Sequence, residues 1–362
     1  MISLKLSHLI VGCAIATVIL FLSLRNHGTA ASTPSPWNFS NKPSSTKNGN
    51  FRSASSPKSI DTRSEMGRAS NATLGFHKIL VLGLPERSDK RDAFVLSASL
   101  TGFEVEFFDA VKGDQILDKT RPPGLNLKDG ALGTWRSHLN AVRSIIENNL
   151  KSVLIMEDDV DWDIRLLSQL PEFAKGVRSL SGIKSSEVQH SPYGDDWDIL
   201  WPGHCGDIMP KGDDRRYTIP NDETVAPKTH QPWLKGLKDL PEKTRMIHKA
   251  GAPMCTFGYA VSYRGAQKIL MALAIKAGDN LAIDNGMAYL CRDGLLDIKC
   301  YSVEPQLFQH HRPAGSVNKD SDINIGDSDA VRQKGITDFI VRSARLNMEQ
   351  LIMGSDQYVE QW

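Results

Sequence analysis

This 362-residue sequence has almost no excess of charge of either sign. Its 43 Lys and Arg residues face 42 Asp and Glu residues, which leaves a formal net charge of +1 at pH 7. Proteins that bind nucleic acid present basic side chains together on one face, where they neutralise a row of phosphates. Here the basic residues are scattered along the chain. The composition therefore argues against a nucleic-acid partner.

Cysteine is scarce, and no two cysteines have the C-x-x-C spacing of a zinc site. Of the five, Cys13 lies in an apolar run. The other four are Cys205, Cys255, Cys291 and Cys300. In an oxidising compartment four cysteines allow three pairings, and we predict Cys205 with Cys255 and Cys291 with Cys300. Buried free thiols are the alternative.

A long apolar run, Leu9–Leu24, lies near the N-terminus. As a helix that starts at Leu6 it would be about 28 Å long, close to the ~30 Å hydrocarbon thickness of a bilayer. We therefore predict a cytoplasmic tip and a transmembrane signal-anchor over residues 1–25. A cleaved signal peptide is the alternative, because Gly28–Ala30 offers small residues at a suitable spacing for a peptidase. Both interpretations place the rest of the chain in the secretory lumen. The anchor predicts a single-pass type II protein of the Golgi or endoplasmic reticulum membrane.

Three regions follow the apolar run. Residues 26–73 are rich in Ser, Pro, Asn and Thr, with too few large apolar side chains to offset the entropy of ordering. We predict a disordered stem there, and it contains the N-glycosylation acceptors Asn38 and Asn71. We expect the main domain at residues 74–315 and a C-terminal extension, packed on that domain, at residues 316–362.

Apolar runs of two kinds alternate from residue 77 onward. Runs of strand length and pattern predict strands at residues 77–84, 103–108, 152–156 and 197–201. Apolar residues at helical spacing predict helices at residues 92–100, 132–149, 264–276 and 336–348. Strands that alternate with helices indicate an α/β layer fold, which opens with a βαβ unit. The polar, Pro-containing residues 206–250 predict a long loop over the site, and we find no internal repeat.

A cluster of acidic residues directly follows the predicted strand at residues 152–156. It consists of Glu157, Asp158, Asp159, Asp161 and Asp163. In open α/β sheets, ligands bind beyond the carboxyl ends of the strands, where this cluster must lie. Neighbouring carboxylates repel each other unless a cation lies between them, and oxygen ligands select Mg²⁺ or Mn²⁺. The cluster therefore predicts a divalent-metal site beside a substrate diphosphate.

Two other interpretations of the cluster stay open. Acidic residues favour the positive N-terminus of a helix, so the cluster can also be an ordinary helix start. Asp159 and Asp161 also resemble the nucleophile and acid of aspartyl phosphatases. That pattern has Thr or Val where this chain has Asp163, and its strand is the first of the domain, which is not so here.

Four short blocks of the sequence occur in a recognisable order: Gly133–His138, Val153–Val160, Trp197–Gly203 and Gly258–Ala266. Together they resemble glycosyltransferase family 25, which contains the lipooligosaccharide galactosyltransferases and, more distantly, the collagen galactosyltransferases. The resemblance covers roughly residues 77–312, and the pattern is more like that of fungal secretory members. It departs from the family at Gly83-Leu84, where members usually have Asn-Leu, and in the greater length of residues 206–250.

This resemblance implies a GT-A-like fold, a Rossmann-type mixed sheet flanked by helices, in a single catalytic domain. It also implies an inverting, Mn²⁺-dependent (or Mg²⁺-dependent) transfer of a hexose, with galactose expected, from a UDP-sugar to a hydroxyl of a glycan or glycoconjugate. The partners are then the UDP-sugar, the acceptor and, through the N-terminal helix, the membrane. A catalytically inactive glycan-binding domain of the same fold is the alternative.

The resemblance identifies Glu157, Asp158 and Asp159 as the acidic motif of the family. We expect Glu157 and Asp158 to contact the nucleotide sugar. We expect Asp158, Asp159 and Asp161 to supply the metal ligands. One of His310 or His311 can complete the metal shell, because imidazole binds Mn²⁺ acceptably, and we take His310. A solvated polar turn is the alternative for both histidines.

Four residues before the cluster are expected near the donor: Arg87, Arg91, Ser137 and His138. Ser137 and His138 precede or open the helical stretch expected at residues 139–149, and a helix N-terminus can hold a phosphate. A solvated charged turn is the alternative for the two arginines, and a purely structural role is the alternative for Ser137 and His138. Inverting transfer needs a base that takes the proton of the acceptor hydroxyl. Asp284 is the predicted base, with a helix N-cap as the alternative.

Overall fold

The computed structural model describes residues 60–362, except 185, 232–234, 277–279 and 324–328. The predicted signal-anchor at residues 1–25 and the acceptor Asn38 lie outside the described residues. Within the described part of the chain, no helix has both the length and the apolar character that crossing a membrane requires. Packed structure begins before residue 74, because Ala69 and Ser70 in the 3-10 turn Gly67–Ser70 are buried.

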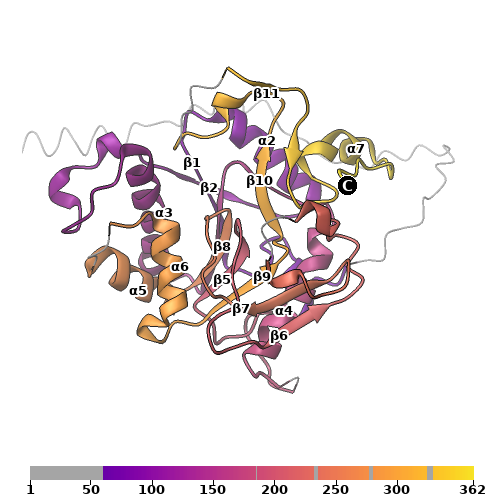
Figure 1. The fold of residues 1–362 in the computed structure, drawn as a ribbon, viewed down its shortest axis with the longest axis horizontal. Coiled ribbons are helices and arrows are strands. Elements are labelled where there is room, and N and C mark those ends of the chain that lie inside the picture. Colours follow the sequence, from indigo (N-terminus) through magenta and orange to yellow (C-terminus); the bar gives the residue numbers. More distant parts are fainter. Residues whose placement is uncertain (1–59, 185, 232–234, 277–279, 324–328) are drawn as a thin grey trace, which may run out of the picture. The chain divides into compact units, whose positions relative to one another are not determined.

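A mixed sheet of eight strands, in the order β2-β1-β3-β8-β5-β9-β7-β6, forms the centre of the domain (Figure 1). The strands are β1 (Lys78–Gly83), β2 (Glu106–Asp109), β3 (Ser152–Glu157), β5 (Ile199–Gly203), β6 (Arg216–Ile219), β7 (Arg245–Lys249), β8 (Gly258–Ser262) and β9 (Cys300–Glu304). β1 runs parallel to both β2 and β3, whereas β8 runs antiparallel to β3 and β5. The predicted α/β fold with an opening βαβ unit is confirmed.

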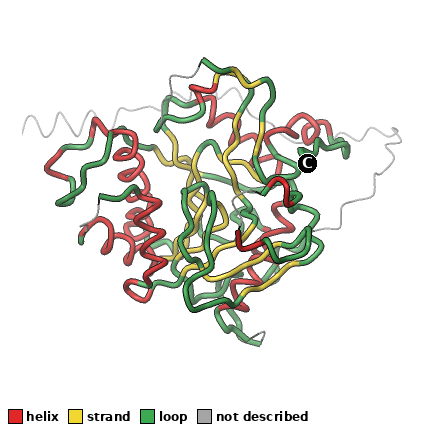
Figure 2. The backbone as a smooth tube through the Cα atoms, viewed as in Figure 1, coloured by secondary structure: helices red, strands yellow, loops and turns green. Residues whose placement is uncertain are grey.

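Helices cover both faces of this sheet (Figure 2). They are α2 (Ser88–Thr101), α3 (Asp129–Glu147), α4 (Leu166–Leu180), α5 (Tyr263–Ile269) with the π-helical turn Leu270–Ile275, α6 (Ile283–Asp293) and α7 (Met348–Met353). Successive side chains of a strand point to opposite faces. Val153 and Ile155 of β3 accordingly pack with α3, α5 and α6, while Leu154 and Met156 pack with α2 and α4. Both faces of β3 are therefore buried, which explains its continuous apolar run.

A smaller sheet joins the acidic cluster to the C-terminal part of the chain. Its strands are β4 (Val160–Trp162), β10 (Phe308–Arg312) and β13 (Ile336–Thr337), and β10 lies antiparallel between the other two. Two further short strands, β11 (Gly315–Ser316) and β12 (Val331–Arg332), pair with each other. The cluster therefore continues into strand β4, and the alternative of a helix start at this point is wrong.

Two predictions of local structure are wrong. Residues 206–250, predicted as a loop, contain the hairpin of β6 and β7, which extends the main sheet because β7 pairs with β9. Residues 336–348, predicted as a helix, begin with β13 and reach helix α7 only at Met348. Phe339 has a φ of 65°, a left-handed conformation that interrupts a right-handed helix.

Both predicted disulfides are present. Cys205 pairs with Cys255, and Cys291 pairs with Cys300, with Cα–Cα distances of 5.6 and 5.8 Å. The first bond ties the chain after β5 to the segment before β8, and the second ties α6 to β9. Disulfides form and persist in oxidising compartments, so the two bonds indicate the secretory pathway.

Candidate active site

A cavity of about 560 Å³ opens at the carboxyl ends of β1 and β3. Because these strands are parallel and adjacent, Leu82 lies opposite Glu157, and both strands end at the same edge of the sheet. The turn after β2, the first half of α3, the end of β10 and residues 321–323 complete the wall. The cavity thus lies where ligands bind in open α/β sheets.

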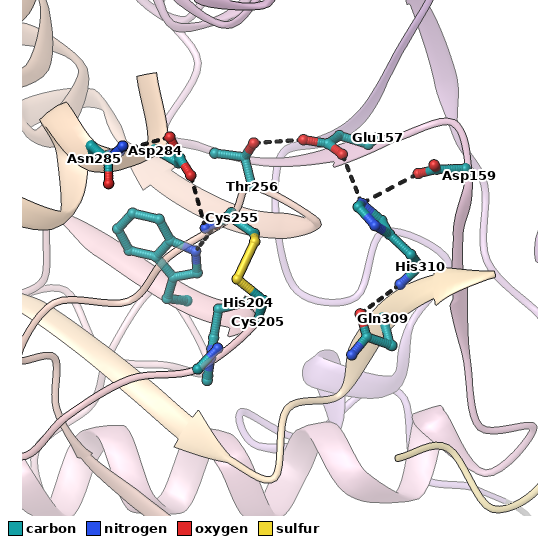
Figure 3. The surroundings of a disulfide bond; sticks show 12 residues. Glu157, Asp159, His204, Cys205, Cys255, Thr256, Asp284, Asn285, Gln309 and His310 are labelled. Atoms are coloured by element: carbon teal, nitrogen blue, oxygen red, sulfur yellow. Dashed lines mark hydrogen bonds and ion pairs between the residues drawn. A yellow bond between two sulfur atoms is a disulfide. The ribbon is translucent and has the colours of Figure 1, made fainter. Parts of the chain in front are cut away.

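Three possible metal ligands meet at one side of the cavity. Oxygen atoms of Glu157 and Asp159 and a nitrogen of His310 all lie within 4.8 Å of one another. The pairing of β10 with β4, which sets His310 opposite Val160, brings the imidazole to the carboxylates. Its Nε2 lies 3.1 Å from Glu157 Oε2 and 3.6 Å from Asp159 Oδ1 (Figure 3). Asp159 Oδ1 is buried and has no hydrogen-bond partner among the described residues.

Arg312 contacts two of these three residues. Its guanidinium donates to His310 Nδ1 at 2.7 Å and to Asp159 Oδ2 at 3.1 Å. Since a guanidinium can only donate, the proton of neutral His310 resides on Nε2, where it faces Glu157. Binding of a cation to Nε2 would displace that proton, as metal binding to protonated ligands does. The two oxygens and one nitrogen form a mixed donor set that suits Mn²⁺ better than Mg²⁺, because Mg²⁺ prefers oxygen ligands.

Glu157 is held by groups from three other elements. Thr256 donates a hydrogen bond to its Oε1 at 2.5 Å, and His138 Nε2 lies 3.7 Å from the same oxygen. Burial alone would raise the pKa of Glu157, but the imidazoles of His138 and His310 outweigh burial and hold that pKa well below its ordinary value. The carboxylate is therefore ionised and able to bind a cation.

Ser137 and His138 both line the cavity, but they lie within α3 rather than at its start. His138 Nδ1 is 2.8 Å from the hydroxyl of Tyr259 on β8. Ser137 Oγ accepts a hydrogen bond from the backbone N–H of Val111 at 2.9 Å. Ser137 thus orients the turn after β2, while His138 faces the acidic cluster. Neither is near a helix N-terminus, so their predicted place at the start of a helix is wrong. Their contact with the donor stays a prediction.

Asp158 faces Lys90 on α2. Lys90 Nζ lies 3.1 Å from Asp158 Oδ1 and 4.0 Å from Asp159 Oδ2. Burial, despite Lys90, raises the pKa of Asp158 to about 6. A side chain at position 83 would collide with the Asp158 carboxylate. Glycine at position 83 therefore leaves room for this carboxylate.

Of the two predicted arginines, the structure brings only Arg87 to the cavity. Arg87 and Lys90 line it and both pair with Asp322, at 2.5 and 3.3 Å. Arg91 instead pairs with Asp109 and donates to the carbonyl of Gly83. Sequence reasoning missed Lys90, although it lies in the same charged turn. It also missed Arg312 and Thr256, and no local signal marks Thr256.

Asp161 and Asp284 do not line the cavity. Asp161 is fully buried, and its carboxylate accepts hydrogen bonds from Thr337, Ser343 and the backbone of Arg345. Asp161 therefore anchors the C-terminal segment and does not lie beside Asp159 in the cavity. The aspartyl-phosphatase interpretation needs both carboxylates at one site, so the structure does not support it. Asp284 lies in the first turn of α6, after the N-cap residue Ala282, and its Oδ2 accepts from the backbone N–H of Cys255 at 3.2 Å (Figure 3).

Known proteins share this sequence pattern at low identity. Procollagen galactosyltransferase 1 of Danio rerio is 22% identical over 311 residues, which cover 78% of this chain and 44% of the relative. Procollagen galactosyltransferase 2 of Homo sapiens is 21% identical over 259 residues, 65% of this chain and 35% of the relative. Inactive glycosyltransferase 25 family member 3 of Homo sapiens is 23% identical over 217 residues, 56% of this chain and 30% of the relative.

The chain therefore spans less than half the length of the curated relatives it matches. Residues 76–200 match the family described as "Glycosyltransferase family 25 (LPS biosynthesis protein)". That stretch contains β1, β3 and most of the residues that line the cavity. Over residues 76–200 the chain is therefore similar to glycosyltransferase family 25, and over a longer stretch it is similar, at low identity, to the procollagen galactosyltransferases.

Proposed function

We propose that this chain transfers a hexose, with galactose the first candidate, from a UDP-sugar to a hydroxyl of a glycan or glycoconjugate, with inversion and with a divalent cation. We propose that it does so in the lumen of the endoplasmic reticulum or Golgi. One observation carries the proposal: the convergence of Glu157, Asp159 and His310 at one side of a cavity at the strand ends. The match of residues 76–200 to glycosyltransferase family 25 supports the reaction class.

Glu157, Asp159 and His310 are the proposed ligands of Mn²⁺ or Mg²⁺. The unpartnered, buried Oδ1 of Asp159 supports this assignment, because a buried carboxylate oxygen without a partner is costly. When bound, the cation offsets the negative charge that develops on the departing diphosphate. Asp158 lies beside these ligands but is paired with Lys90, and we propose that it orients this lysine.

Arg87 and Lys90 are the proposed contacts of the donor diphosphate. Both line the cavity and both carry positive charge, and the carboxylates around Lys90 outweigh burial and raise its pKa. A diphosphate would compete with Asp322, which pairs with both cations. Positive groups fixed beside a leaving diphosphate stabilise the charge that develops there.

Asp284 remains only a predicted base. It does not line the cavity, and its carboxylate accepts a hydrogen bond from the Cys255 backbone N–H instead. Among the described residues, the carboxylates that line the cavity and are not proposed as ligands are Glu86, Asp114, Asp129, Asp158 and Asp322. A base must come within hydrogen-bond distance of the acceptor hydroxyl. The bound acceptor therefore decides which of these groups serves.

The test is a donor screen with the purified full chain. UDP release is measured across a panel of UDP-sugars, with and without an acceptor, in Mn²⁺ and in EDTA. We expect release in Mn²⁺ that EDTA abolishes, and loss of release in Asp159→Asn. The matched control is Asp293→Asn, which removes an exposed carboxylate that pairs with Arg292. Release that persists in EDTA would contradict the proposed role of the metal.

A catalytically inactive glycan-binding domain is the second candidate. The pairing of Lys90 and Arg312 with Asp158 and Asp159 favours it, because these cations already neutralise two carboxylates. One relative is also named inactive. Binding of a glycan without UDP release from any donor, in Mn²⁺, would support this second function and refute the first.

A further inference from the structure

The short segment Cys255–Phe257, just before β8, contacts two of the three proposed metal ligands. Thr256 Oγ donates to Glu157 Oε1 at 2.5 Å, and the carbonyl of Phe257 accepts from the Glu157 backbone N–H at 3.2 Å. The ring of Phe257 lies against that of His310, with centroids 3.7 Å apart. The position of Glu157 and His310 thus depends on the conformation of this segment.

Cys255 holds a conformation that the rest of the structure must impose. Its φ is 65°, in the left-handed region that residues other than glycine rarely adopt. Three side chains fix it there. Cys205 binds its sulfur covalently, Asp284 accepts from its N–H at 3.2 Å, and Trp201 donates to its carbonyl at 3.2 Å.

The groups that hold Cys255 in this conformation come from two segments that lie far apart in the sequence. Cys205 follows β5, and its backbone N–H donates to the carbonyl of Met254 at 2.9 Å, beside the disulfide. Asp284 comes from the first turn of α6. Figure 3 shows the resulting continuous path from Asp284 through Cys255 and Thr256 to Glu157 and on to His310.

We infer that the Cys205–Cys255 disulfide and Asp284 are positioning groups for the proposed metal site, acting through Thr256 and Phe257. This inference rests on the proposed function. Asp284 then needs only an oxygen that accepts the Cys255 N–H, and it need not take a proton. Groups that orient metal ligands typically change metal affinity or activity by 10–100-fold when removed.

The first experiment separates positioning from base catalysis at Asp284. Mn²⁺ binding to the full chain in the presence of UDP is measured by titration calorimetry, and UDP release is measured in parallel. We expect Asp284→Ala to weaken Mn²⁺ binding by about 10–100-fold and Asp284→Asn, which keeps an acceptor oxygen, to retain most of the affinity and turnover. Loss of turnover in Asp284→Asn with wild-type Mn²⁺ affinity would identify a base and overturn the inference for Asp284.

The second experiment compares the two disulfides. The double variants Cys205→Ser/Cys255→Ser and Cys291→Ser/Cys300→Ser remove one bond each, and neither Cys291 nor Cys300 lines the cavity. Thermal unfolding checks that each variant folds. We expect weaker Mn²⁺ binding in the first variant alone. Equal Mn²⁺ affinity in the two folded variants would overturn the role of the Cys205–Cys255 bond.

If loss of the disulfide prevents folding, the single variant Thr256→Val tests the same contact. It removes only the hydroxyl that donates to Glu157, so the fold should persist while Mn²⁺ affinity falls by about tenfold or more. Unchanged Mn²⁺ affinity in Thr256→Val would overturn this inference and leave the proposed function standing. Absence of Mn²⁺ binding to the wild-type chain would overturn the proposed function, and this inference with it.

Discussion

Glu304, at the end of β9, is a buried carboxyl group whose titration should dominate the change of unfolding free energy between pH 5 and pH 8. It is 1% exposed, and its Oε1 accepts from the backbone N–H of Asp207 at 3.3 Å. Its Oε2 lies 3.9 Å from Nε2 of His248, whose Nδ1 donates to the carbonyl of Lys249. Burial first, and then the charge of Asp207, raise the pKa of Glu304 to about 8. The group is therefore mostly protonated at neutral pH in the folded protein.

The magnitude follows from linkage. In the unfolded chain Glu304 has its ordinary pKa of 4.5, so the folded state binds its proton more tightly. Stability from this group is fully present below pH 4.5 and is lost as the pH rises through about 8. At about 1.4 kcal/mol per pKa unit, the loss between pH 5 and pH 8 is roughly 3–4 kcal/mol. Glu304→Gln has the shape of the protonated acid and no charge, so it should lack this loss.

Urea unfolding of wild type and Glu304→Gln at pH 5 and pH 8, with disulfides intact, measures the effect. Relative to wild type, the variant should gain roughly 3–4 kcal/mol of unfolding free energy on going from pH 5 to pH 8. Glu223→Gln, at an exposed glutamate that pairs with Lys243, should follow wild type at both values. A difference between Glu304→Gln and wild type that does not change with pH would refute the reasoning.

Three other changes have definite expected outcomes. Asp322→Asn frees two cations in the cavity and should tighten UDP binding, measured by calorimetry, about two- to fivefold, because partly exposed ion pairs contribute little. Asp198 is fully buried and accepts from Arg264 and Lys268, so Asp198→Ala should lower the unfolding free energy in urea by about 3 kcal/mol. Mn²⁺ at about 100 times its Kd should stabilise the folded chain by about 2.7 kcal/mol in the same assay, and Asp159→Asn should abolish that gain.

Strands and helices whose pattern is local were predictable from the sequence. The apolar runs of β1, β3 and β5 and the helical spacing of α3 each appear within a short window, because burial of one or both faces dictates them. Residues 206–250 were not predictable in this way. Strand β7 forms because it can pair with β9, which lies about fifty residues later in the chain, and such pairing leaves little mark on either segment alone.

The ligand set shows the same limit. His310 and His311 are neighbours in β10, and the sequence does not distinguish them. In the structure the alternation of the strand sends His310 toward Glu157, while His311 Nδ1 contacts the Thr337 hydroxyl at 2.8 Å. Asp161, two residues from Asp159, turns to Thr337 and Ser343 for a similar reason.

By itself, the sequence determined that a buried strand ends in carboxylates and that the fold is α/β, because these follow from local composition and spacing. It left free thiols as an alternative to disulfides, and the structure decided that all four cysteines after residue 200 are paired. The tertiary structure alone decided which carboxylates face the cavity, which histidine joins them and that Thr256 orients Glu157. His310 and Glu157 are 153 residues apart in the chain. Only the pairing of β10 with β4 and the packing of the segment before β8 bring these side chains together, and no local pattern encodes such contacts.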